Sequence, residues 1–217
     1  MLDVACGVGA SIIQVARETG ADGLGVDLSG ELLAKARSAA AAGQLDGRVR
    51  FLEGDAEALP LEDETVDAVL SECAFCTFPD KPTAASEMAR VLRPGGRLAL
   101  ADVIAEPARL PPELVTVQGW VACIAGARPP DELRALLEDA GLHVEVIRPA
   151  DGAHARLLDR VEARLRLAGM LADSTPEELR GRAARGLELV AAAREAIGAG
   201  ALGYALLSAT KPGWAGR

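Results

Sequence analysis

A glycine-rich turn near the start of the chain is the first group of residues that could do chemistry. The apolar segment Leu2–Val4 runs into Cys6-Gly-Val-Gly9, and a helical pattern follows. Glycines 7 and 9 let the backbone approach a ligand closely, and the helix start offers N–H groups without partners. Asp27 ends the next apolar segment, 18 residues after Gly9, where a carboxylate can accept hydrogen bonds from a ribose diol. The spacing therefore predicts a nucleoside site on a parallel sheet.

The same glycines argue against a nicotinamide dinucleotide, whose fingerprint has a third glycine where this chain has Ile12. The order Asp3-x-x-x-Gly-x-Gly9 instead resembles motif I of class I S-adenosylmethionine (SAM) methyltransferases. The resemblance implies that Asp3 helps to fix the methionine end of SAM, that residues 6–9 wrap it and that Asp27 holds the ribose. Ala5 stands where the family usually has its first glycine.

Later motifs extend the resemblance over residues 1–148 and 202–212. Gly54-Asp-Ala56 looks like the family's adenine-recognition element, in which Asp55 accepts from the adenine amino group and the Ala56 N–H donates. The segments 67–70 and 91–96 resemble later family motifs. Singly, each motif has a simpler reading, such as an ordinary turn or a loop carboxylate, but five in order favour the family. The cofactor-binding residues implied are Asp3, Ala5, Cys6, Gly7, Gly9, Asp27, Leu28, Asp55, Ala56 and Ser71.

Cysteines gather where ligands bind in an open α/β sheet, beyond the carboxyl end of a strand. The fourth predicted strand ends in Ser71-Glu-Cys73-Ala-Phe-Cys76, and Cys123 follows 50 residues after Cys73. This arrangement resembles the arsenite methyltransferases, which carry Ser-x-Cys at this strand end and a further cysteine at similar spacing. The resemblance implies that Cys73 and Cys123 are the thiolates that bind trivalent arsenic as the substrate, and that Ser71 lies beside the methionine of SAM.

Thiolate chemistry suits this substrate, because soft sulfur ligands bind soft metal and metalloid ions. The arsenic lone pair carries no proton, so we expect no catalytic acid or base. Three roles remain open for Cys76: a third arsenic ligand, a resolving thiol, or no role. Cys6 is expected to contact SAM through its backbone rather than its sulfur. The competing interpretation is that Cys73 and Cys123 are buried structural thiols. The cysteine-bearing C-terminal part of the arsenite enzymes is replaced here by a helical segment without cysteine.

Two other functions remain open at this point. One is a methyltransferase for oxygen, nitrogen or carbon of a small organic molecule, which would usually have a base or an aromatic-lined pocket. The other is a SAM-binding module without catalytic activity, whose helical insertion contacts a partner.

Composition narrows the range of partners. The 217 residues carry a formal net charge of −9, which argues against a nucleic-acid groove. No apolar stretch is long enough to span a membrane, and there is no signal peptide pattern. Four cysteines without secretory context indicate reduced thiols. We therefore expect a cytoplasmic protein that handles a small molecule or metalloid, with a thiol reductant as a candidate partner; the oligomeric state is not predicted.

The remaining pattern predicts the elements that must position these residues. Strands and helices alternate as in a Rossmann-like, doubly wound, mainly parallel seven-stranded sheet, with the reversed last strand carried over from the family. We expect one domain over residues 1–217, with a helical elaboration at about 153–200 before the last strand. Class I methyltransferases normally carry helices before the first strand, so we also expect N-terminal helices upstream of residue 1. The first strand is predicted to start at residue 1 and to run into the glycine turn, and further strands are predicted at 23–27, 49–53, 66–70, 97–104, 143–147 and 204–210. Helices are predicted at 10–20, 30–42, 82–92, 129–140, 153–171 and 176–197, with a short one within 111–126.

Overall fold

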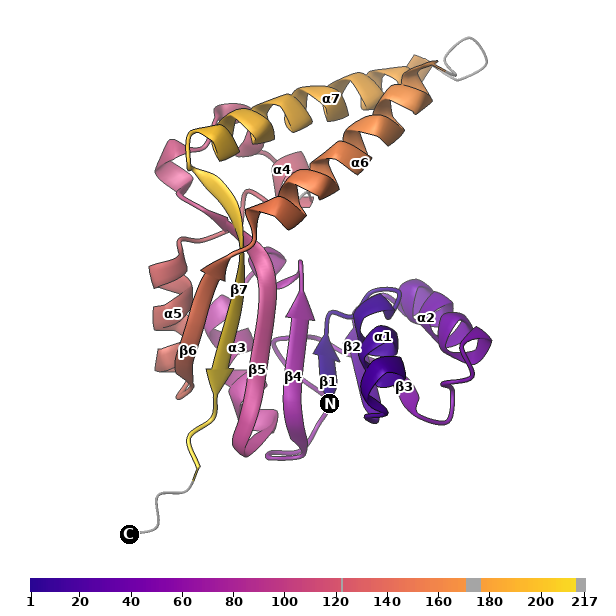
Figure 1. Cartoon of the computed structure of the whole chain (residues 1–217), viewed down its shortest axis with the longest axis vertical. Coiled ribbons are helices and arrows are strands. Elements are labelled where there is room, and N and C mark those ends of the chain that lie inside the picture. Colours follow the sequence, from indigo (N-terminus) through magenta and orange to yellow (C-terminus); the bar gives the residue numbers. More distant parts are fainter. Residues whose placement is uncertain (122, 171–176, 214–217) are drawn as a thin grey trace. The chain divides into compact units, whose positions relative to one another are not determined.

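A seven-stranded sheet organises the described part of the computed structural model, which comprises residues 1–121, 123–170 and 177–213. The strands lie in the order β3-β2-β1-β4-β5-β7-β6 (Figure 1). β1 pairs in parallel with both β2 and β4, so the strand order reverses between β1 and β4. Figure 1 shows β7 running opposite to its neighbours. The Rossmann-like fold predicted from the sequence is confirmed. The strands are β1 (Leu2–Val4), β2 (Gly23–Asp27), β3 (Val49–Glu53), β4 (Val66–Glu72), β5 (Leu92–Ala105), β6 (His143–Pro149) and β7 (Leu202–Thr210).

The chain folds into two compact units. The first unit comprises Met1–Asp102, Pro130–Arg148 and Leu206–Arg217, and the second comprises Val103–Pro129 and Pro149–Ala205. The chain therefore passes between the units within β5 and β7, and again before the helix α5 (Pro130–Asp139) and at the end of β6. The expectation of a single domain stays a prediction, and each unit is described by itself below.

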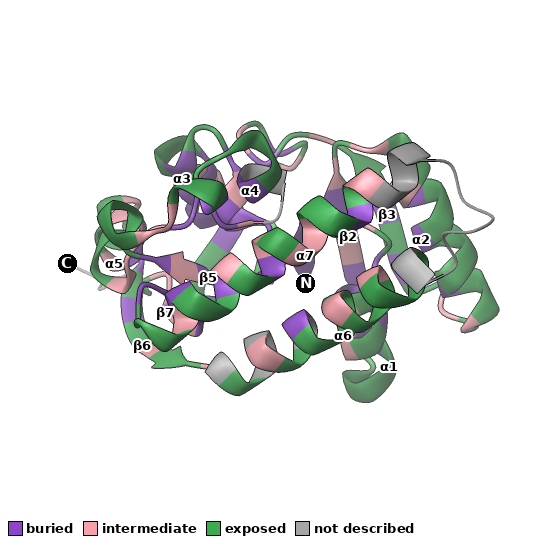
Figure 2. Ribbon diagram, turned by 90° about the horizontal axis from the view of Figure 1, so that it is seen from above, coloured by how far each residue is buried: buried purple, intermediate pink, exposed green. Residues whose placement is uncertain are grey.

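Four α-helices accompany the sheet in the described part of the first unit: α1 (Ala10–Thr19), α2 (Gly30–Ala42), α3 (Lys81–Val91) and α5 (Pro130–Asp139). α1 and α3 lie on opposite faces of the sheet (Figures 1 and 2). Side-chain caps fix two of the helix starts. The Ser29 hydroxyl accepts the Leu32 N–H at 3.3 Å, and the Asp80 carboxylate accepts the Thr83 N–H at 3.1 Å.

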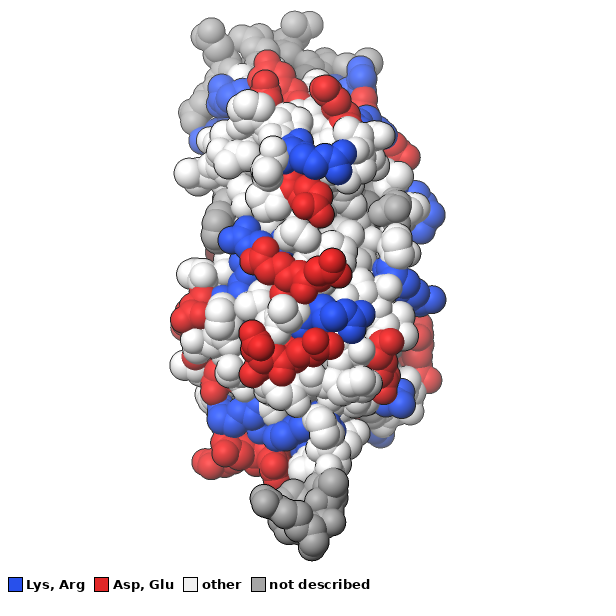
Figure 3. All heavy atoms as spheres, turned by 90° about the vertical axis from the view of Figure 1, so that its left-hand side faces the viewer, with Lys and Arg blue, Asp and Glu red and all other residues white. Residues whose placement is uncertain are grey.

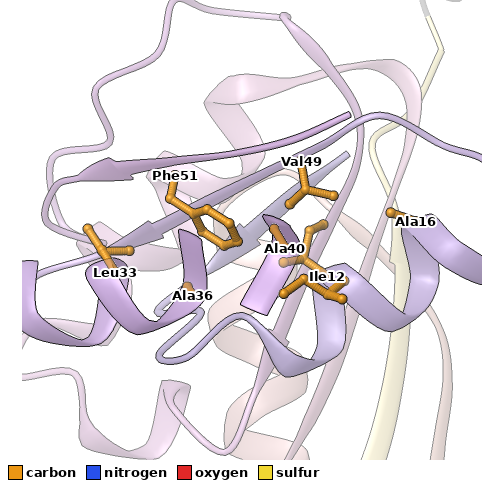
Figure 4. Close-up of a cluster of buried hydrophobic side chains, with 8 residues drawn as sticks. Ile12, Ala16, Leu33, Ala36, Ala40, Val49 and Phe51 are labelled. Carbon is orange, nitrogen blue, oxygen red and sulfur yellow. The ribbon is translucent and has the colours of Figure 1, made fainter. Parts of the chain in front are cut away.

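The core beneath α1 and α2 is made mostly of aliphatic and alanine side chains. In Figure 4, Ile12 of α1 and Leu33, Ala36 and Ala40 of α2 surround Val49 and Phe51 of β3. Small residues on α2 let the helix approach the strand closely enough to bury the Phe51 ring, which is 5% exposed. This packing fixes the carboxyl ends of β1 and β2, from which the candidate site is built.

The second unit is mainly helical. Its 3-10 turns are η2 (Pro107–Arg109) and η3 (Pro112–Leu114), and its α-helices are α4 (Val117–Val121), α6 (Asp151–Met170) and α7 (Glu177–Gly198). α6 and α7 pack side by side. Arg194 of α7 forms ion pairs with Asp159 (2.6 Å) and Glu162 (2.9 Å) of α6. These are the two helices expected at 153–171 and 176–197; residues 171–176 of the predicted elaboration lie outside the described residues.

Several element boundaries differ from the sequence prediction by one or two residues, and the start of β5 differs most. A turn at Arg93–Gly96 before a strand at 97–104 is what the local sequence predicts, but β5 already begins at Leu92. Leu92 pairs with Val66 and Arg97 with Ala68, so residues 93–96 form an irregularity inside the strand. Lys211, the residue after β7, pairs with this irregular stretch: the Gly95 N–H donates to the Lys211 carbonyl at 2.8 Å, and the Lys211 N–H donates to the Gly96 carbonyl at 2.9 Å.

Two surface properties complete the description. On the described part of the face shown in Figure 3, basic and acidic side chains alternate, and neither sign forms a continuous patch. Among the helices that the structure describes, none has the length and apolar character needed to cross a membrane.

Candidate functional site

A pocket of about 230 Å³ lies in the first unit where β1, β2 and β3 end. Its walls are these strand ends and the segment that follows β4. The switch point of an open α/β sheet is where ligands usually bind, so the pocket occupies the expected position. Its lining residues are Ala5, Asp27, Leu28, Gly54, Asp55, Ala56, Glu57, Thr77, Phe78 and Pro79.

The turn after β1 follows a backbone path that favours glycine. Ala5, Gly7 and Gly9 all have left-handed φ angles, at 58°, 54° and 75°. A Cβ atom at Gly9 would lie 2.8 Å from the Phe51 ring, whereas one at Gly7 would meet no atom within 4 Å. Glycine is therefore favoured at position 9 both by the left-handed backbone and by the close contact with Phe51. At position 7 only the backbone conformation favours glycine.

This difference gives a matched pair of variants. We expect Gly9→Ala to lower the free energy of unfolding by about 2–4 kcal/mol, because left-handed strain and overpacking add. Gly7→Ala should cost only about 1 kcal/mol, from the backbone conformation alone. Urea denaturation measures both, and equal losses would contradict the steric role assigned to Phe51.

Ala5, the departure from the family pattern, also bears on stability. An L-residue at φ 58° is strained, and glycine at this position is not. We expect Ala5→Gly to raise the free energy of unfolding by about 0.5–1 kcal/mol, the relief of strain exceeding the added flexibility of the unfolded chain. Thermal denaturation at one pH checks this, and a lowered Tm would contradict it.

Asp27 ties the glycine turn to the end of β2. Its Oδ2 atom accepts the Gly7 N–H at 2.8 Å and its Oδ1 atom accepts the Ser29 N–H at 2.9 Å. These two contacts orient the carboxylate, and each oxygen keeps a further lone pair for a ligand. Beside it, the Leu28 side chain is 68% exposed on the pocket wall, where it offers an apolar surface to a flat ligand.

The loop after β3 forms the neighbouring wall. The Asp55 carboxylate accepts the Glu57 N–H at 2.9 Å and remains exposed, while Ala56 is 7% exposed. The pocket thus brings together Ala5, Asp27 and Leu28 with Asp55 and Ala56, residues from the ends of three strands.

Two buried polar atoms lack a hydrogen-bond partner within the described residues, Asp3 Oδ2 and Ser71 Oγ. They belong to adjacent strands, since Asp3 of β1 is paired with Leu70 of β4. Burial raises the pKa of Asp3 to about 7, with smaller contributions from the charges of Glu72 and Asp27, and a hydrogen bond from the Ile12 backbone opposes the shift. Unpartnered buried oxygens are rare in proteins and indicate that a polar group from outside the chain completes them.

Cys6 lies in the glycine turn after β1 and has a packed sulfur. Its sulfur lies against β2, so that a Cβ at Gly25 would come within 2.6 Å of it. Burial raises the pKa of the Cys6 thiol to about 12, with help from the nearby charges of Asp3 and Asp27. The thiol is therefore neutral and packed.

The cysteines predicted to bind substrate are placed as follows. Cys73 directly follows β4, is partly exposed, and continues the β4–β5 pairing by donating its N–H to the Ala101 carbonyl at 2.8 Å. Cys76 lies in the 3-10 turn η1 (Phe75–Thr77) and is only 2% exposed. Cys123 is partly exposed and belongs to the second unit, whereas Cys73 and Cys76 belong to the first.

Sequence reasoning did not assign five of the pocket residues. Gly54, Glu57, Thr77, Phe78 and Pro79 line the pocket, the last three from the segment between β4 and α3. The signal that could have found Thr77–Pro79 was their position directly after the cysteines, at the same strand end.

Comparisons with known proteins agree with this geometry. Residues 2–100 match the family model described as a methyltransferase domain. An arsenite methyltransferase from Halobacterium salinarum is 36% identical over 154 residues, which are 70% of this chain and 39% of that protein. The 27-O-demethylrifamycin SV methyltransferase of Amycolatopsis mediterranei is 33% identical over 147 residues, 67% of this chain and 54% of that protein. The chain thus spans about half the length of these curated relatives or less.

A solved structure has the same fold. Phosphoethanolamine N-methyltransferase 2 from Haemonchus contortus, in complex with S-adenosyl-L-methionine, matches with a TM-score of 0.78 at 20% identity. The match covers 98% of this chain and 48% of that one.

Proposed function

Because residues 2–100 belong to the methyltransferase domain family and the chain has the class I fold, we propose that this protein transfers a methyl group from SAM to trivalent arsenic held by Cys73 and Cys123. The family match supports SAM as the cofactor and methyl transfer as the reaction class. The metalloid substrate and the two sulfur ligands are the part that is proposed.

The cofactor fits the residues at the ends of β1, β2 and β4. The unpartnered Asp3 Oδ2 and Ser71 Oγ atoms are suited to the polar methionine end. Asp27 has lone pairs free for the ribose hydroxyls, and Leu28 and Ala56 offer an apolar surface for adenine. Bound there, SAM supplies an electrophilic methyl carbon on a sulfonium group.

The observation that carries the arsenic proposal is the backbone of the two cysteines. Cys73 (φ 51°) and Cys123 (φ 65°) are among the five described non-glycine residues with positive φ. Such a conformation costs of order 1–3 kcal/mol and persists where the surroundings over-determine it, which is common at functional sites. The resemblance of the sequence to the arsenite methyltransferases implied the same two cysteines, and the 36% identity to one such enzyme supports that resemblance.

In the proposed reaction the protein contributes ligation and alignment. Two thiolates hold As(III) with its lone pair free, and the lone pair forms the new As–C bond while the C–S bond breaks and its electron pair stays on sulfur. Alignment of this kind can supply roughly 7–11 kcal/mol in favourable cases. No proton moves in the step, so the residues need no general base. A thiol reductant is the proposed partner that would return methylated arsenic to the trivalent state.

A small organic molecule is the second candidate acceptor. The 33% identity to a rifamycin methyltransferase favours it, since that relative acts on an organic oxygen by its name. Such a substrate would need neither Cys73 nor Cys123, and this separates the two candidates.

Calorimetric titration of the reduced protein with As(III), combined with chromatographic detection of methylated arsenic after addition of SAM, tests the proposal. We expect one As(III) per chain and methylarsenic formation that requires SAM. Absence of As(III) binding, with methylation of a phenolic or amine acceptor, would establish the organic candidate instead.

A further inference from the structure

Two buried side chains of opposite charge hold the segment that follows β4. Lys81 is 6% exposed and Asp102 is 3% exposed. Asp102 Oδ2 accepts the Cys76 N–H at 3.0 Å. Lys81 Nζ donates to the carbonyl oxygens of Cys76 and Phe78, both at 2.9 Å. The backbone of Cys76 is therefore bound to a carboxylate at its N–H and to an ammonium at its carbonyl, and charge-assisted bonds of this kind are the strong ones.

This segment, Cys73–Asp80, contributes to two parts of the site. Thr77, Phe78 and Pro79 line the cofactor pocket, while Cys73 and Cys76 carry thiols. Cys76 directly precedes Thr77 in the sequence, so one of these thiols belongs to the residue next to the pocket wall. Anything that displaces the wall also displaces the Cys76 backbone.

Regular structure does little to hold the segment in place. Its only helical turn is η1, and the hydrogen bonds from Thr77 to Ala74 and from Phe78 to Phe75 stay within the segment. One end is anchored by Cys73 N–H on Ala101, and the other by Asp80 N–H on the Glu57 carboxylate at 2.7 Å. The charged contacts of Lys81 and Asp102 attach its middle.

We propose that Lys81 and Asp102 are positioning residues that hold Cys73–Asp80 in one conformation and so couple the cofactor pocket to the cysteine thiols. The coupling rests on the proposed function, in that the pocket takes SAM or its product S-adenosylhomocysteine (SAH). Cys76 is buried, so its sulfur reacts with an outside reagent only when the segment opens. A ligand that stabilises the pocket wall makes that opening rarer. By thermodynamic linkage, opening of the segment lowers the affinity of the pocket for the ligand by the same factor.

Lys81→Met tests the proposal, since it keeps the apolar stem and removes the ammonium. Lys211→Met is the matched control, because Lys211 Nζ also donates to a backbone carbonyl, that of Leu92 at 2.8 Å, and does not line the pocket. Two quantities are measured: SAH affinity by calorimetry, and the rate of Cys76 alkylation by iodoacetamide, with and without SAH, by mass spectrometry. We expect Lys81→Met to weaken SAH binding and to speed Cys76 alkylation, each by about tenfold. Lys211→Met should lower Tm and change neither quantity by more than about twofold.

The proposal is overturned if Lys81→Met keeps wild-type SAH affinity and an unreactive Cys76, or if Lys211→Met produces the same losses. Should Lys81→Met fail to fold, Asp102→Asn keeps the side-chain size and removes the charge, with the exposed Asp67→Asn as its control. A wild-type protein that did not bind SAH would contradict the proposed cofactor site, and the alkylation rates without SAH would still decide the role of Lys81 and Asp102.

Discussion

Replacing Cys73 by serine is expected to lower the affinity for As(III) by at least about 100-fold and the rate of arsenic methylation by about 1000-fold. A hydroxyl is a hard, neutral ligand at neutral pH, so the variant loses one of two sulfur donors and the alignment that depends on both. Cys123→Ser should give losses of the same order. Calorimetry with As(III) and single-turnover methylation assays measure the two effects.

Cys6→Ala is the control for this series. The Cys6 sulfur packs against β2 and its thiol has a raised pKa, so its removal should reduce stability without changing As(III) affinity. Retention of full As(III) affinity by both Cys73→Ser and Cys123→Ser would refute the metalloid site. Cys76→Ser separates its three candidate roles: an affinity loss indicates a third ligand, slowed multiple turnover alone indicates a resolving thiol, and no change indicates no role.

Asp3→Asn is expected to stabilise the ligand-free protein while removing most of its cofactor affinity. The pKa of Asp3 is about 7 in the folded protein, against 3.8 as its ordinary value. Between these values the folded state holds a proton that the unfolded state has lost, so the stability of the wild type falls as pH rises from about 4 to 7 and then levels off. At pH 8 the ionised, buried carboxylate costs about 2–4 kcal/mol, which the neutral amide avoids.

Urea denaturation of the ligand-free protein at pH 5 and pH 8 measures this effect. The wild type should lose stability over that interval and Asp3→Asn should not. The exposed carboxylate of Asp67, on the neighbouring strand β4, supplies the control, since Asp67→Asn should keep the wild-type pH dependence. Parallel curves for the wild type and Asp3→Asn would contradict the assignment.

Ligand binding should show the opposite dependence. The methionine ammonium of the cofactor is attracted by an ionised Asp3, and few Asp3 side chains are ionised at pH 5.5. We therefore expect SAH affinity to rise about tenfold from pH 5.5 to 7 in the wild type and to stay low and flat in Asp3→Asn. A pH-independent affinity in the wild type would place the methionine end elsewhere.

Much of the fold follows from local sequence signals. The ranges 23–27, 30–42 and 49–53 were predicted with the bounds that the structure has, because apolar runs are bounded there by glycine, serine and acidic residues. The start of β5 was missed for a physical reason. Pro94, Gly95 and Gly96 are turn residues by local preference, and the hydrogen bonds of Gly95 and Gly96 to Lys211 join residues far apart in the chain.

The candidate site was predictable where it depends on backbone motifs. Asp27 was predicted from its place at the end of a strand 18 residues after Gly9 and Asp55 from the resemblance of its motif to the family, and both line the pocket. The raised pKa of Asp3 and the charged contacts around Cys76 were not predictable, since they arise from burial and from residues such as Lys81 and Asp102 that become neighbours only in the folded chain.

The place of β7 has a consequence for how the protein is made. β7 lies between β5 and β6 in the sheet, although it is the last strand in the chain. On the ribosome, β6 leaves the exit tunnel long before β7 is synthesised, and until then it has no strand to join. The two unpaired edges of β5 and β6 remain available to other nascent chains during translation of α6 and α7. Chaperone demand during synthesis should therefore be set by the length of this helical insertion, and shortening the insertion should reduce aggregation at high expression.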